Sequence, residues 1–172
     1  HVSTDYVFDG AKRSPYLEHD AVAPLQVYGQ SKLDGERLVL ERHPGALIVR
    51  TSTLFGAGRA MRPHYVSAIL RQAREGRRIE VVKLPVASPT YSIDLANAIG
   101  ELLRCAATGS VHGSNRGGCS RLDLAREIVR LAGGEGVEVH ERSAVAGAPA
   151  RPVYSVLDTT KFSGVTGRQM PS

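Results

Sequence analysis

The segment QVYGQSKLDGERLVLERHPGALIV, residues 26–49, contains the change of pattern on which the fold prediction rests. Its first part, from about residue 26 to residue 43, has leucines at helical spacing, and Pro44-Gly45 ends the expected helix. The run from Ala46 to Val49 is wholly apolar and has the length of a strand that is buried on both faces of a parallel sheet. The segment therefore predicts a helix followed by a buried strand.

Short apolar runs and amphipathic stretches continue to alternate on both sides of this segment, which is typical of parallel α/β architecture. Val2 to Thr4 has the pattern of the end of a buried strand. Further helices are expected over residues 62–76, 93–107, 122–132 and 157–162, and strands over residues 79–82, 110–114 and 137–139. The order of these elements becomes less regular after Gly58. This change indicates two lobes whose segments interleave along the chain.

The composition is that of a globular protein that can bury a core: 172 residues, of which 42% are hydrophobic. Lys and Arg number 22 against 17 Asp and Glu, so the net charge of +5 suits an anionic partner. No apolar run is long enough to span a membrane, and no signal-peptide pattern opens the chain; we expect a cytoplasmic protein without membrane contact. Two cysteines and six scattered histidines predict no protein-built metal site.

The positive charge does not by itself indicate nucleic-acid binding. Arg71, Arg74, Arg77 and Arg78 follow one expected helix and its end, where arginines usually form a solvated face. Aromatic residues make up only 5% of the chain, which leaves no evident platform for base stacking. We therefore expect no nucleic-acid partner.

Tyr28 and Lys32 form a Y-x-x-x-K pattern at the start of the first helix. Their i, i+4 spacing places both side chains on one face, with Cβ atoms about 5–6 Å apart. An ammonium group beside a phenol favours the phenolate, so the pair suits a general acid that protonates a carbonyl oxygen. A solvated pair on an exposed helix would give the same short pattern. The neighbouring motifs decide between the two interpretations.

Six motifs in a fixed order carry a family resemblance. They are S-T-D-Y-V-F-D-G (3–10), P-Y-L-E-H-D (15–20), P-L-Q-V-Y-G-Q-S-K-L-D-G-E (24–36), V-R-T-S (49–52), S-P-T-Y-S-I-D-L-A (88–96) and R-P-V-Y-S-V-L-D (151–158). In these motifs the chain resembles the extended short-chain dehydrogenase/reductases, specifically the dTDP-4-dehydrorhamnose reductases. The resemblance implies a Rossmann-type NAD(P)-binding fold, here a partial parallel sheet, with a small interleaved α+β substrate-binding lobe. It assigns residues 1–60 and 88–115 to the Rossmann part, and residues 61–87 and 116–172 to the lobe.

The activity that the resemblance implies is reduction of the 4-keto group of a dTDP-6-deoxy-4-keto-hexulose by NADPH or NADH, giving dTDP-L-rhamnose or a related deoxysugar. By position in the motifs, Tyr28 donates the proton and Lys32 binds the nicotinamide ribose. Thr4 would hydrogen-bond the keto oxygen, and Ser3 would join Tyr28 and Lys32 in contacting the cofactor. The family's glycine-rich phosphate loop is expected upstream of His1.

Three further residues are expected at the substrate. Asp5 would orient the sugar or, equally, cap the turn that follows the strand. Arg151 would bind a diphosphate through its planar fork, or be an ordinary surface arginine. Thr53 stands where these reductases usually have Trp, so the identity of the sugar stays open.

One rival interpretation comes from a different functional class. The regulatory β subunit of methionine adenosyltransferase resembles the same motifs, with the Tyr and the Lys included, and it acts as a binding partner rather than a reductase. The resemblance also leaves open a Mg²⁺ ion as a second cofactor and a homodimer.

Overall fold

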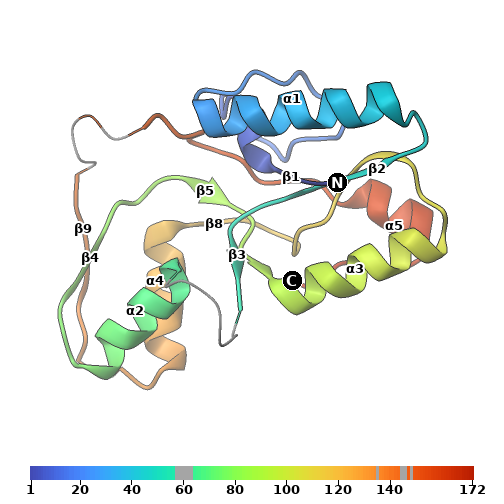
Figure 1. Cartoon of the computed structure of the whole chain (residues 1–172). Helices are drawn as coiled ribbons and strands as arrows, with labels where there is room; N and C mark the ends of the chain where they lie inside the picture. Colours follow the sequence, from blue (N-terminus) through green and yellow to red (C-terminus); the bar gives the residue numbers. More distant parts are fainter. Residues whose placement is uncertain (57–63, 135, 144–146, 148) are drawn as a thin grey trace.

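Three parallel strands form the main sheet, in the order β1 (Val2–Thr4), β2 (Leu47–Thr51) and β7 (Gly109–His112). Val49 of β2 is in register with Val2 on one side and with Val111 on the other. Helix α1 (Val27–Arg42) covers one face of this sheet, and α3 (Ser92–Arg104) and α5 (Thr160–Thr166) lie at the other face (Figure 1). The prediction of a parallel α/β fold is confirmed.

The computed structural model describes residues 1–56, 64–134, 136–143, 147 and 149–172. The other elements in this part of the chain are short. They are the 3₁₀ turn η1 (Asp5–Val7), β3 (Leu54–Phe55), α2 (Tyr65–Arg74), β4 (Ile79–Val81), β5 (Val86–Ala87), β6 (Thr90–Tyr91), β8 (Cys119–Ser120), α4 (Arg121–Leu131) and β9 (Val139–Glu141).

Two buried contacts dock helix α1 onto the sheet. At its first turn Gly29 lies so close to η1 that a Cβ atom there would be 2.2 Å from the carbonyl oxygen of Tyr6. About two turns further on, Glu36 accepts hydrogen bonds from the Arg50 guanidinium on β2, from Nε at 3.0 Å and from Nη2 at 2.7 Å. Both partners are almost fully buried. These contacts fix where the N-terminal end of α1 lies relative to the ends of the strands.

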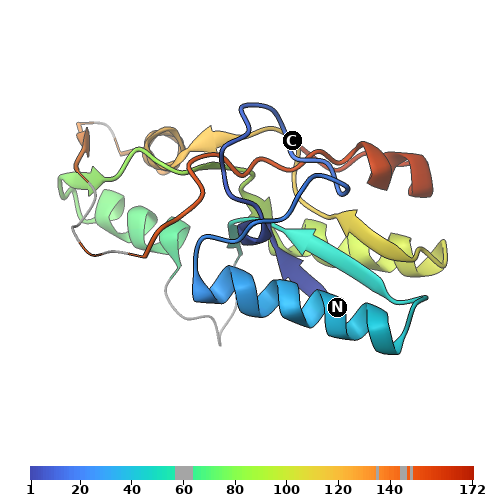
Figure 2. The same ribbon diagram turned by 90° about the horizontal axis from the view of Figure 1, so that it is seen from above.

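A second group of elements lies beside this sheet rather than on it, as Figure 2 shows: α2 and α4 with the parallel pair β4 and β9. Its core contains Ile69, Ile79, Leu122 and Val129. Phe162 of α5, in contrast, packs with the core of the main sheet. The boundaries of the two lobes, residues 1–60 with 88–115 and residues 61–87 with 116–172, stay a prediction.

Two expected elements begin later than the sequence pattern indicates. The last helix starts at Thr160, because the Asp158 carboxylate accepts from the backbone N–H of Thr160 and forms a turn before the helix. The strand expected from residue 137 starts at Val139, the residue in register with Ile79 of β4. Residues 144–146 and 148 of the loop expected over residues 144–152 lie outside the described residues, as does the start of the helix expected from residue 62. No helix in the described part of the chain is long and apolar enough to cross a lipid bilayer.

Candidate active site

A pocket of about 230 Å³ lies at the carboxyl ends of β1 and β2, next to the first turn of α1. We call it the sheet-end pocket. Its lining consists of Val2, Ser3, Thr4, Tyr28, Lys32, Thr51, Ser52, Thr53 and Leu54. The structure thus brings together Tyr28, Lys32, Thr4, Ser3 and Thr53, which the sequence places in three separate segments. In open α/β sheets this edge is the usual place for ligands.

Tyr28 and Lys32 occupy one side of the sheet-end pocket. The Tyr28 side chain is 52% exposed, and its ring meets the ring of Tyr6 edge to face, with the centroids 6.1 Å apart. Lys32 Nζ donates a hydrogen bond to the carbonyl oxygen of Val2 at 2.6 Å. This bond ties the ammonium group to the end of β1 and leaves its other two N–H groups for a ligand.

Asp5 is buried directly behind this pocket. Its Oδ1 accepts from the Thr4 hydroxyl at 3.1 Å, and its Oδ2 accepts from the hydroxyls of Ser52 at 2.8 Å and Ser155 at 2.6 Å. Burial raises the pKa of Asp5, and the three hydroxyl donors act against that rise. We call these four residues the Asp5 cluster. The direct contact of Asp5 with a sugar stays a prediction, and the geometry shows its oxygens engaged by protein hydroxyls.

Two buried hydroxyl groups in the pocket lining have no hydrogen-bond partner among the described residues. They are Ser3 Oγ and Thr51 Oγ1. A buried polar group without a partner costs free energy unless a ligand or water satisfies it. Together with Lys32, these hydroxyls suit the hydroxyl and amide groups of a nicotinamide riboside. The chain therefore offers a fitting contact surface for this part of a dinucleotide.

Thr53 lies at the edge of the same pocket in a strained backbone conformation. Its φ angle is +41°, in the left-handed region that β-branched residues rarely adopt. Strain of this kind costs on the order of 1–3 kcal/mol and persists where the surroundings hold it. Here the backbone N–H of Thr90 donates to the Thr53 carbonyl at 3.1 Å. Thr53 lies in the short connection between β2 and β3, and this connection forms one edge of the pocket.

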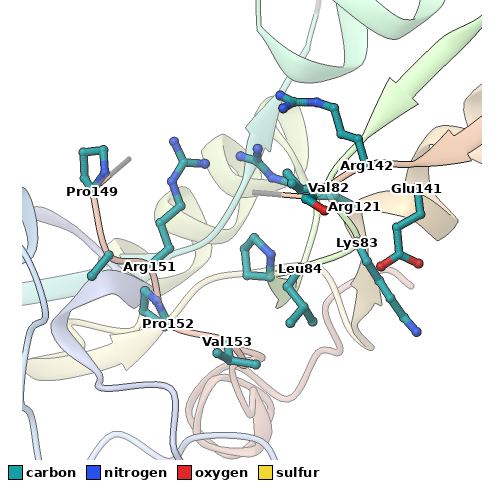
Figure 3. A pocket seen from close by; sticks show the side chains of 13 residues that line it. Val82, Lys83, Leu84, Arg121, Glu141, Arg142, Pro149, Arg151, Pro152 and Val153 are labelled. Carbon is teal, nitrogen blue, oxygen red and sulfur yellow. The ribbon is translucent and has the colours of Figure 1, made fainter. Parts of the chain in front are cut away.

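A larger pocket of about 540 Å³ lies between the two groups of elements (Figure 3). We call it the arginine pocket. Its charged lining residues are Lys83, Arg121, Glu141, Arg142 and Arg151. Figure 3 shows the three guanidinium groups directed to one side of the pocket, and the side chains of Lys83 and Glu141 directed to the other. Four cations against one carboxylate give this pocket an excess of positive charge, which favours an anion electrostatically, and Arg151 is the member that the sequence predicted to bind one.

Tyr6 lines neither pocket but lies close to residues of both. Its ring contacts Tyr28. Burial raises the pKa of Tyr6, the nearby Asp5 adds to the rise, and the positive charges of Arg151 and Arg121 act against it. The pKa of Arg121 is lowered by burial and by the charge of Arg151. Sequence reasoning missed Tyr6, although it lies two residues after Thr4 in the first motif, and it missed Arg121, for which no local pattern gives a signal.

The described residues do not support the Mg²⁺ ion that the family resemblance left open. Within this part of the chain, no group of three or more His, Cys, Asp or Glu side chains lies close enough together to hold a metal ion. Mg²⁺ binding requires several oxygen ligands around one point. We therefore assign no step to a metal.

The sequence is similar to known proteins of one family. The family model described as "RmlD substrate binding domain" matches residues 1–172. A dTDP-4-keto-6-deoxy-D-glucose reductase of Streptomyces niveus is 36% identical over 171 residues, which are 96% of this chain and 58% of that protein. A probable dTDP-4,6-dihydroxy-2-methyloxan-3-one 4-ketoreductase of Streptomyces antibioticus is 40% identical over 95% of this chain and 56% of its own length. The chain thus spans little more than half the length of these relatives.

Solved structures extend the agreement to three dimensions. The crystal structure of a dTDP-4-dehydrorhamnose reductase from Bacillus anthracis in complex with NADP superposes with a TM-score of 0.92 at 37% identity, covering 100% of this chain and 60% of that one. A UDP-glucuronic acid 4-epimerase from Bacillus cereus, at 21% identity and a TM-score of 0.79, shares the fold. The predicted Rossmann-type fold is confirmed. With a family model that matches from the first residue to the last, the chain belongs to the RmlD substrate-binding domain family.

Proposed function

We propose that the protein containing this chain is an NADPH-dependent nucleotide-sugar oxidoreductase. It would reduce the 4-keto group of a dTDP-6-deoxy-4-keto-hexulose to dTDP-L-rhamnose or a related deoxysugar. The observation that carries the proposal is the sheet-end pocket, which holds Tyr28, Lys32 and Thr4 together next to a cationic pocket. The NADP complex of the Bacillus anthracis reductase supports the choice of cofactor. A cytoplasmic location and a homodimer stay predictions.

The chemistry requires one hydride and one proton. NADPH, when bound, supplies the hydride to C4 of the sugar. Tyr28, which is about half exposed and lines the sheet-end pocket, gives its phenolic proton to the keto oxygen. Lys32 holds the nicotinamide ribose with the N–H groups that its bond to Val2 leaves free. Thr4, in the lining beside Tyr28, contacts the oxygen atom that is being reduced.

The arginine pocket accounts for the rest of the substrate. The positive charges of Arg121 and Arg151 act to lower the pKa of Tyr6, whose ring contacts Tyr28. The diphosphate therefore binds at these two arginines, and the sugar lies beside Tyr28. Planar guanidinium groups suit the paired oxygens of a diphosphate. The nucleoside extends toward Lys83 and Glu141, which point to the other side of the pocket (Figure 3). Thr53 borders the sugar and leaves more room there than an aromatic side chain would.

The test uses the full-length protein and follows NADPH oxidation with a dTDP-4-keto-6-deoxyhexose. We expect turnover in the parent and a loss of about 10²–10⁴-fold in Tyr28→Phe, with NADPH affinity unchanged, because only the acidic hydroxyl is removed. Tyr91→Phe is the matched control, since the Tyr91 ring packs against Phe55. A parent that binds NADPH and the nucleotide sugar but turns over no keto sugar would refute the proposal and favour the regulatory-subunit interpretation.

A further inference from the structure

Tyr65 lies next to the arginine pocket without lining it. It is the first residue of helix α2, and its partner Arg121 is the first residue of helix α4. The Tyr65 hydroxyl donates a hydrogen bond to the backbone carbonyl oxygen of Arg121 at 2.6 Å. Cζ of Arg121 lies 5.0 Å from the centroid of the Tyr65 ring, within the range of a cation–π contact. Tyr65 thus contacts both the backbone and the side chain of Arg121.

The backbone of Arg121 is held from two directions. Its N–H donates to the carbonyl oxygen of Lys83 at 3.0 Å, and Lys83 lines the same pocket. Burial raises the pKa of Tyr65 to about 12, and the positive charge of Arg121 acts against the rise. The Tyr65 hydroxyl therefore keeps its hydrogen far above neutral pH and stays a donor to the Arg121 carbonyl, which only accepts. These two bonds fix Arg121 at the wall of the pocket.

The Tyr65 ring takes the place that a carboxylate has beside several other arginines of the chain. Within the described residues Arg121 forms no ion pair, and burial together with the nearby charge of Arg151 lowers its pKa. A carboxylate would neutralise the guanidinium and occupy its N–H groups. An aromatic ring attracts the cation through its quadrupole but carries no net charge. The positive charge of Arg121 thus remains available to an anion.

We propose that Tyr65 is a positioning residue that holds the guanidinium of Arg121 in place for the diphosphate of the substrate. The inference rests on the proposed function, which places the diphosphate at Arg121 and Arg151. An arginine that rotates freely loses side-chain entropy when an anion binds, and repulsion from Arg151 turns it away from the pocket. Because the contact with Tyr65 orders the side chain in the free protein, less entropy is lost on binding and the diphosphate binds more tightly.

Calorimetric titration of the full-length protein with dTDP measures this effect without turnover. Tyr65→Leu removes the ring and the hydroxyl. We expect the dissociation constant for dTDP to rise about fivefold, the effect of immobilising one long side chain on binding. Tyr65→Phe keeps the ring, and we expect its affinity within about twofold of the parent. With the keto-sugar substrate, Tyr65→Leu should raise KM and leave kcat unchanged, because Tyr28 and Lys32 lie in the other pocket.

Two comparisons separate this role from a general loss of stability. Leu70→Ala removes apolar contact from the same helix and the same core, so it should lower the melting temperature and leave the dTDP dissociation constant unchanged. In an Arg121→Gln background, Tyr65→Leu should add no further loss of affinity, because its effect passes through Arg121.

An isosteric ring tests the electrostatic part of the contact. Pentafluorophenylalanine at position 65 has nearly the size of Phe, but its fluorine atoms withdraw electron density from the ring face and remove the attraction for a cation. We expect it to bind dTDP about fivefold more weakly than Tyr65→Phe.

Several results would overturn the inference. They are a dTDP affinity in Tyr65→Leu within about twofold of the parent, an equal loss in Tyr65→Phe or in Leu70→Ala, an equal further loss in the Arg121→Gln background, or a parent that binds no dTDP. If Tyr65→Leu does not fold, equal affinities of Tyr65→Phe and the pentafluorinated variant overturn it. Absent turnover in a parent that binds dTDP would instead refute the proposed function alone.

Discussion

Gly29 allows helix α1 to touch the turn that follows β1, and its replacement by Ala tests how tightly the site depends on that contact. A Cβ atom at Gly29 would lie 2.2 Å from the carbonyl oxygen of Tyr6 and 3.0 Å from Cβ of Pro24. Ordinary contact begins at 3.4 Å, so the helix or the turn has to move by about 1.2 Å, the difference between 3.4 and 2.2 Å. Tyr28 is the adjacent residue, and its ring packs on Tyr6, so its hydroxyl moves as well.

The expected loss is larger in activity than in stability. Overpacking costs about 1–3 kcal/mol, and Ala regains about 1 kcal/mol over Gly inside a helix, so the net loss of stability is about 0–2 kcal/mol. A reacting group that is misplaced by about 1 Å can lose 10²-fold in rate. We therefore expect Gly29→Ala to fold and to lose about 100-fold in kcat.

Gly35→Ala, on the same helix, is the matched control. Its Cβ would meet only the ring of His1, at 3.4 Å, which is an ordinary contact. Urea unfolding should show Gly35→Ala gaining up to about 1 kcal/mol, and NADPH oxidation should show kcat near that of the parent. If Gly29→Ala turns over the keto sugar within about threefold of Gly35→Ala, the reasoning about the close contact is wrong.

Three further outcomes follow from single contacts. Lys32→Ala should weaken NADPH binding by at least about tenfold in a fluorescence titration, because a charge-assisted contact to the ribose is lost; wild-type affinity would contradict that role. Glu36→Gln should cost about 3–5 kcal/mol in urea unfolding, since Arg50 stays buried without its carboxylate; a loss below about 1 kcal/mol would count against the ion pair. The hydrogen bond from Lys12 holds the pKa of Asp20 below its ordinary 3.8, so its stabilisation is present above pH 3.8 and is lost as the pH falls through the folded-state pKa. The stability difference between the parent and Asp20→Asn should therefore be present at pH 7 and vanish in acid, and a difference independent of pH would exclude this contribution.

The elements that the sequence predicts correctly are those whose information is local. The helix before Pro44-Gly45 and the apolar strand after it are read from periodicity and from residues that stop a helix. The pairing of Tyr28 with Lys32 follows from their i, i+4 spacing on one helix. Ser3 and Thr4 could be placed at a ligand-binding edge, because the carboxyl ends of parallel strands share that edge.

The role of Asp5 shows where local information ends. A carboxylate directly after a strand suits a turn cap and a substrate contact equally well. Its closest hydrogen bond comes from Ser155, which is 150 positions away along the chain. Neither the burial of Asp5 nor the identity of its three donors has a counterpart in the neighbouring sequence. Only the folded chain can distinguish an exposed ligand group from a buried acceptor.

The net charge of +5 predicted an anionic partner without a location, and the ion pairs of the fold explain why counting charges could not give one. Several surface arginines are matched by a nearby carboxylate: Arg77 by Glu75, Arg78 by Glu80, Arg104 by Glu101 and Arg130 by Glu127. Within the described residues, Arg121, Arg142 and Arg151 form no such pair, although they come from three separate segments. Two of them lie close enough for one charge to lower the pKa of the other. Unmatched cations that repel each other across a pocket are stabilised when an anion binds between them, so the excess charge of the chain acts where the diphosphate of the proposed substrate would bind.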